Sequence, residues 1–153
     1  MDLDPTDKRI LAALQRDGRM STVELADTIG LSPTPVARRV RELEAAGVIQ
    51  GYTAIIDPRK VGSSIQAVVQ IKLEQHSDEI AERFRATLEG MPEVSACYAL
   101  TGDMDFLLHV ALRDIDALSD FTLRQLLRIP GVRDMRTSVV LRTVKRGLSI
   151  AVN

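Results

Sequence analysis

Residues 21–43 read STVELADTIGLSPTPVARRVREL, and this stretch decides the fold of the first half of the chain. It opens on Ser21, with Glu24 three residues later, which is the pattern of a capping box at the start of a helix. Gly30 is expected to end that helix, because glycine takes a positive φ without a steric penalty. The sequence therefore predicts a short helix followed by a tight turn.

A second helix is expected to begin at Ser32 and to face inward with Val36, Val40 and Leu43. Ala26, in the preceding helix, is small enough to let the second helix cross closely, and Val36 fills the space between them. Two helices joined in this way predict a helix-turn-helix. The second helix of that motif fits the major groove of double-stranded DNA.

The outward face of this second helix carries the candidate DNA-binding residues. Hydroxyl groups beside the positive end of a helix bind phosphate, and an arginine reads guanine or holds a phosphate. Residues 28–41 contain three arginines and no acidic residue, which makes a local positive patch. The candidates are Ser32, Thr34, Pro35, Arg38, Arg39 and Arg41.

Two alternatives stay open for these arginines. The three could form an ordinary solvated helix face, and Arg39 could instead pair with Glu42 or Asp27 in a structural role. The whole chain of 153 residues has 20 basic and 21 acidic residues, so bulk charge does not bind it to DNA or to a membrane. We therefore expect one protomer to bind DNA weakly and several such helices, presented together, to bind it well.

The scarcity of cysteine and histidine also narrows the classes of function that the sequence allows. A single cysteine, Cys97, excludes an intrachain disulfide, and the two histidines, His76 and His109, have no metal-ligand spacing. We interpret Cys97 as a small buried or interface thiol and His109 as a packed strand residue. The acidic start is unlike a signal peptide, and no apolar run approaches the ~20 residues that span a bilayer. We expect a cytoplasmic protein associated with the nucleoid, with no cofactor, no metal and no enzymatic activity.

The sequence predicts two domains and a linker, in an α+β fold. Three helices are expected within residues 1–50, the first beginning at Asp4 and ending near Asp17. Residues 51–63 are interpreted as a linker or hinge that contains a short strand. Residues 64–153 are expected to form the second domain.

The second domain is expected to follow a β-α-β-β-α-β order, the ferredoxin-like plan with an antiparallel sheet. Alternating apolar residues from Ile65 to Leu73 predict a half-buried strand. Residues 94–101 and 104–112 are two apolar runs that Gly102-Asp103 divides, which predicts a hairpin. A helix over 114–127 and a strand over 136–145 follow. Two helices would cover one face of the sheet, and a homodimer partner is the expected cover of the other.

The chain resembles the Lrp/AsnC (feast/famine) family of transcription regulators along essentially its whole length. The pieces are modestly specific alone and highly specific in this order. They are residues 3–11, 14–19, 24–26, 30–32, 39–52, 101–106, 129–132 and 137–140.

The resemblance implies a sequence-specific DNA-binding regulator whose C-terminal domain senses a small molecule, usually an amino acid. It also implies homodimers that assemble into octamers or other even-numbered rings, with the effector bound between subunits. The alternative is an architectural DNA-organising protein of the same fold that responds to no effector.

The loop over residues 101–105 is the candidate effector site. Backbone N–H groups at Gly102 and Asp103 suit a carboxylate, and Asp105 suits an ammonium group; without a ligand the same residues would be only a hairpin turn. By resemblance, a strand of the neighbouring dimer completes the pocket. The candidates are Thr101, Gly102, Asp103, Met104, Asp105, Thr137, Ser138, Val139 and Val140.

Overall fold

The computed structural model describes residues 2–74, 77–145 and 150–151, and the chain divides into two compact units. One unit comprises Met1–Ile55 together with Val144–Asn153, and the other comprises Ile56–Thr143. Each unit has its own hydrophobic core. None of the helices in the described part of the chain is long and apolar enough to cross a membrane.

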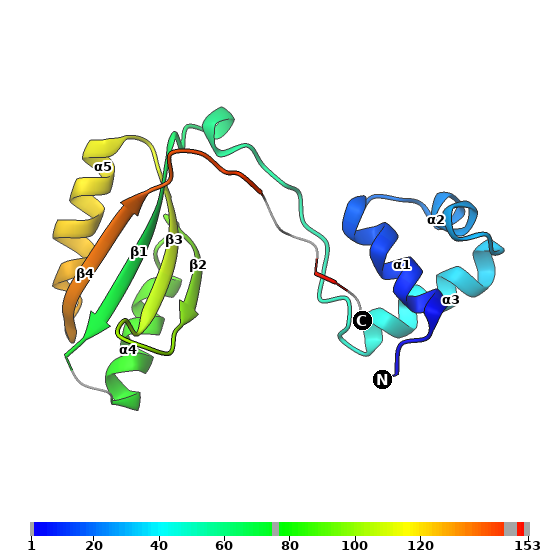
Figure 1. The fold of residues 1–153 in the computed structure, drawn as a ribbon, viewed down its shortest axis with the longest axis horizontal. Helices are drawn as coiled ribbons and strands as arrows, with labels where there is room; N and C mark the ends of the chain where they lie inside the picture. The colour runs from blue at the N-terminus through cyan, green and yellow to red at the C-terminus, as the bar shows by residue number, and fades with distance from the viewer. Residues whose placement is uncertain (1, 75–76, 146–149, 152–153) are drawn as a thin grey trace. The chain divides into compact units, whose positions relative to one another are not determined.

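Helices α1 (Pro5–Arg16), α2 (Thr22–Ile29) and α3 (Pro33–Ala45) build the first unit (Figure 1). Asp4 and Ser21 cap α1 and α2 with the reciprocal hydrogen bonds of a capping box, as the sequence predicts. The buried faces of the helices meet in one apolar core. Its fully or nearly fully buried members are Ile10, Leu11, Ala13, Leu25, Ala26, Ile29, Val36 and Leu43.

Two contacts fix other segments of the chain to this unit. The Tyr52 hydroxyl donates to a Glu44 carboxylate oxygen at 2.9 Å, so the first part of the linker is attached to the end of α3. The Gln15 side-chain amide accepts from the Ile150 N–H at 2.6 Å and donates to the Ile150 carbonyl at 3.2 Å. Ile150 is therefore hydrogen-bonded to α1.

The second unit is a four-stranded antiparallel sheet in the order β2-β3-β1-β4. The strands are β1 (Ile65–Leu73), β2 (Val94–Ala99), β3 (Phe106–Leu112) and β4 (Val132–Val139). Along the chain, helix α4 (Asp78–Glu89) connects β1 to β2. Helix α5 (Ile115–Asp120) follows β3 and continues through η2 (Phe121–Gln125) and η3 (Leu126–Arg128) before β4. The predicted β-α-β-β-α-β order is confirmed (Figure 1).

Both helices pack on the same face of the sheet. Alternate residues of β1, from Ala67 to Leu73, are buried with Phe84 of α4 and Phe121 beyond α5. The rings of Phe84 and Phe106 lie 4.9 Å apart at the centre of this core. The intervening β1 residues point to the opposite face, which none of the described helices of this unit covers.

The structure differs from the sequence-based expectations at three places. Residues 51–57 form no strand, since no neighbouring strand offers hydrogen bonds to them in the single chain. The β2–β3 connection spans residues 100–105 rather than a two-residue turn. Strand β4 begins at Val132 and ends at Val139 because its pairing with β1 sets its limits, so Val140 lies just beyond it.

Candidate DNA-binding and effector sites

The turn between α2 and α3 sets the position of the candidate DNA-binding helix. Gly30 has φ 71°, and the N–H of Leu31 donates to the Ala26 carbonyl at 3.0 Å, which closes the end of α2. Ala26 and Val36 are both completely buried, so α3 crosses α2 at close range. This is the helix-turn-helix that the sequence predicts.

Replacing Gly30 with alanine should destabilise the protein by about 1 kcal/mol. An added Cβ meets no atom within 4 Å, so the cost arises from the left-handed backbone conformation alone. Thermal unfolding measures it, and Gly90→Ala is the matched control because Gly90 has φ −85°. Equal melting temperatures for the two variants would contradict this explanation of the turn.

The solvent-facing side of α3 carries most of the predicted DNA-binding residues. Ser32, Thr34, Arg38 and Arg41 are exposed, and Pro35 is partly exposed. Ser32 precedes the helix but makes no side-chain capping hydrogen bond, and the first turn of α3 contains no acidic residue. The positive end of α3 and the Ser32 hydroxyl are therefore open to a phosphate group.

Arg38 and Arg39, although adjacent, have different surroundings. The Arg38 side chain is 59% exposed and pairs with Glu42 on its own helix at 2.5 Å. Such an exposed pair within one helix is weak and exchanges readily for a DNA contact. Arg38 remains a candidate for reading DNA.

Arg39, in contrast, is turned toward α1. Its Nη1 lies 2.6 Å from Asp4 Oδ2 and 2.8 Å from Asp7 Oδ1, and the Asp7 side chain is only 6% exposed. Hydrogen bonds to Asp7 and then to Asp4 raise the pKa of Arg39 above its ordinary value. Arg39 therefore belongs to an ion-pair cluster with Asp4 and Asp7 rather than with Glu42 or Asp27, and its contact with DNA stays a prediction.

The same cluster acts on the N-cap of α1. The pKa of Asp4 lies below its ordinary value, first because the Asp7 N–H donates to its carboxylate and further because Arg39 lies beside it. Arg39 thus joins the beginning of α1 to the middle of α3. Sequence reasoning missed these partners because they lie more than thirty positions away from Arg39.

The predicted effector loop has three exposed residues followed by two that are held in place. Thr101, Gly102 and Asp103 are exposed, whereas Met104 is buried within the protomer. The Asp105 carboxylate accepts from the Leu73 N–H at 2.7 Å and lies 3.6 Å from Lys72 Nζ. Asp105 therefore fixes the loop to the end of β1, a role that the sequence did not reveal.

The loop and the second group of predicted effector residues are separated within one chain. Thr137 pairs with Val69 and Val139 pairs with Ala67, while the loop leads into Phe106, opposite Ile71. Strand β1 lies between β3 and β4, so residues 137–140 are not beside their own loop. Thr137, Ser138 and Val139 are exposed and Val140 partly so, as a contact with another subunit requires.

The cysteine and the two histidines that the sequence analysis considered are Cys97, His109 and His76. Cys97 is solvent-accessible on β2, and partial burial raises the pKa of its thiol. The His109 ring contacts Tyr98 edge-on at 6.0 Å on the face of the sheet that no helix of its unit covers. His76 lies outside the described residues. Among those that are described, no group of three or more histidine, cysteine or acidic residues is arranged to hold a metal ion.

Comparison with known proteins supports both halves of this description. Residues 3–50 match the model of a winged helix-turn-helix DNA-binding family, and residues 66–150 match the Lrp/AsnC ligand binding domain. The leucine-responsive regulatory proteins of Salmonella typhimurium and Escherichia coli are each 43% identical to the chain over 145 residues. These alignments cover 95% of this chain and 88% of each relative.

Solved structures agree with the same assignment. A transcriptional regulator of Neisseria meningitidis, determined as a complex with L-Met, has a TM-score of 0.93 and 39% identity, over 97% of this chain and 96% of its own. Escherichia coli AsnC has a TM-score of 0.87 and 28% identity, over 99% of each chain.

A helix-turn-helix followed by a ligand-binding sheet domain defines a DNA-binding transcriptional regulator rather than an enzyme. The chain belongs to the Lrp/AsnC family of such regulators.

Proposed function

We propose that this regulator binds operator DNA through α3 as a homo-oligomer and that an amino acid bound to its C-terminal domain changes this binding. The observation that carries the proposal is the exposed face of α3, with Arg38 and Arg41 outward and Arg39 occupied by α1. Ser32, Thr34 and Pro35 add phosphate and groove contacts near the start of the helix. The complex of the Neisseria regulator with L-Met supports an amino acid as the effector class.

The assembly is proposed on physical grounds. One face of the sheet is left without cover by its own unit, and the predicted linker strand has no neighbouring strand in one chain. A homodimer supplies both, and dimers that join into an octamer or another even-numbered ring bring residues 137–140 to the loop of a neighbour. A protein of this kind would act in the cytoplasm, on the nucleoid.

Effector binding is tested with a thermal-shift screen of the twenty amino acids on the full chain. At least one should raise the melting temperature, because a ligand that binds only the folded state stabilises it. The same compound should change the affinity for operator DNA. If no amino acid does either, the protein is an architectural DNA-organising member of the fold and the sensing proposal fails.

Asp105→Asn separates the two roles of Asp105. The amide oxygen still accepts from the Leu73 N–H, so stability should change little, but the charge that attracts an ammonium group is lost. Calorimetry should show at least about tenfold weaker effector binding. Lys72→Met is the control, since it removes the partner at 3.6 Å and keeps the carboxylate. Wild-type affinity in Asp105→Asn would leave Asp105 with a structural role only.

A further inference from the structure

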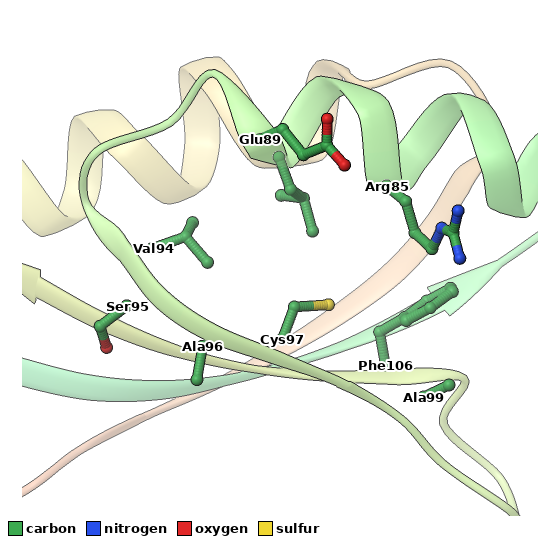
Figure 2. Close-up of a pocket in the computed structure, with 9 residues that line it drawn as sticks. Arg85, Glu89, Val94, Ser95, Ala96, Cys97, Ala99 and Phe106 are labelled. Atoms are coloured by element: carbon green, nitrogen blue, oxygen red, sulfur yellow. The ribbon is translucent and has the colours of Figure 1, made fainter. Parts of the chain in front are cut away.

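A pocket of about 550 Å³ lies between α4 and the edge strand β2 (Figure 2). The residues that line the pocket between positions 95 and 99 of β2 are all small, so the helix and the strand leave a space that larger residues would fill; they are Ser95, Ala96, Cys97 and Ala99. Its apolar lining comes from Leu88, Val94 and Phe106. We call this the α4–β2 pocket; it is built entirely from one protomer.

Charged side chains complete the lining. Arg85 and Glu89 stand one turn apart on α4, and both line the pocket (Figure 2). Arg85 Nη2 donates hydrogen bonds to the two carboxylate oxygens of Glu82, at 2.9 and 2.7 Å. A guanidinium group has five N–H donors, so this contact leaves donors on the other nitrogens for a second anion. The pocket therefore offers one cation, one anion and an apolar floor.

We propose that the α4–β2 pocket binds a free α-amino acid with an apolar side chain, at a site separate from the loop over residues 101–105. The carboxylate of the ligand pairs with Arg85, its ammonium group pairs with Glu89, and its side chain packs against the apolar floor. The volume lies within the range of small-molecule sites. A nucleotide is disfavoured, because its phosphates would meet the carboxylate of Glu89 and only one arginine.

Cys97 makes the test direct, because it lines this pocket and is the only cysteine in the chain. The rate of Cys97 alkylation by iodoacetamide is measured on the full chain, with and without each amino acid. Burial raises the pKa of this thiol, so the reaction is run near pH ~9 to give a measurable rate. Leucine or methionine should slow alkylation about fivefold or more at saturation, and aspartate and lysine should not.

Variants of the charged lining residues test whether the slower alkylation of Cys97 arises from binding in the α4–β2 pocket. Arg85→Gln and Glu89→Gln should each require at least about tenfold more amino acid for the same protection. Arg83→Gln is the matched control, since Arg83 is on the same helix and pairs with Glu79 rather than lining the pocket. Thermal unfolding of each variant checks that it remains folded.

The outcomes separate this site from the loop. Protection that persists in Asp105→Asn supports an independent pocket, whereas protection lost in that variant places the ligand at the loop and overturns the proposal. If an amino acid raises the melting temperature but never slows alkylation of Cys97, effector sensing stands and the α4–β2 pocket is refuted as its site. If alkylation is slowed but DNA binding is unchanged by the same amino acid, the pocket stands and the proposed effect of that amino acid on DNA binding fails.

Discussion

Arg38→Ala should lower the affinity for operator DNA by about tenfold or more for each α3 that contacts the duplex. An arginine that reads guanine through two hydrogen bonds contributes about 1–3 kcal/mol, and the proposed dimer would present two copies of α3. The folded state should be little affected, because Arg38 is 59% exposed and its pair with Glu42 is solvated. Fluorescence anisotropy at a fixed salt concentration measures the loss.

The salt dependence of the same titration distinguishes the two possible roles of Arg38. If Arg38 only holds a phosphate, the variant weakens binding to every duplex equally and reduces the slope of log affinity against log salt by about one for each site. If it reads a base, the loss is larger on the operator than on a random duplex. Unchanged affinity on both duplexes would remove Arg38 from the DNA interface.

Arg39→Ala should show the opposite profile, with a melting temperature lowered by at least about 5 °C. The substitution leaves the buried carboxylate of Asp7 without its cation and separates α3 from the N-cap of α1. Weaker DNA binding should follow only in proportion to the unfolded fraction. Differential scanning calorimetry of the full chain measures the change.

Two comparisons make this second prediction specific. Arg39→Lys should recover part of the stability, because an ammonium group keeps the charge but contacts the two carboxylates less well than a guanidinium. Arg38→Ala, one position away, should melt close to the wild type. A stable Arg39→Ala protein that has lost DNA affinity would return Arg39 to the DNA interface and contradict the structural assignment.

Features that depend on neighbouring residues could be predicted from the sequence. The caps of α1 and α2 follow from Asp4 and Ser21, and the turn before α3 follows from Gly30, because each involves atoms only a few positions apart. The alternation from Ile65 to Leu73 likewise gave β1 and its buried face. The order of helices and strands in both units followed from such patterns.

Features that depend on distant residues could not be predicted. The partners of Arg39 lie in α1 and at its N-cap, and the hydrogen bond from the Leu73 N–H to Asp105 joins β1 to the β2–β3 connection. The limits of β4 are set by its pairing with β1 rather than by its own apolar run. The α4–β2 pocket arises only when small strand residues face a helix far away in the sequence.

The predicted effector site also depends on residues that are distant from one another. Its loop and residues 137–140 lie apart in one chain, so the proposed shared pocket requires a second subunit. The expected linker strand likewise lacks a partner within the protomer. Both predictions concern the proposed assembly: the linker strand was predicted from its apolar run, and the role of residues 137–140 from the resemblance to the family.

Whether this chain regulates transcription through α3 is decided most directly by a competition titration. The wild-type protein is bound to a fluorescent duplex from the region upstream of its own gene and competed with unlabelled operator or with a scrambled duplex, with and without the amino acid identified by thermal shift. We predict that the operator competes at least about a thousandfold better than the scrambled duplex and that the amino acid changes this ratio. Equal competition by the two duplexes would contradict sequence-specific regulation.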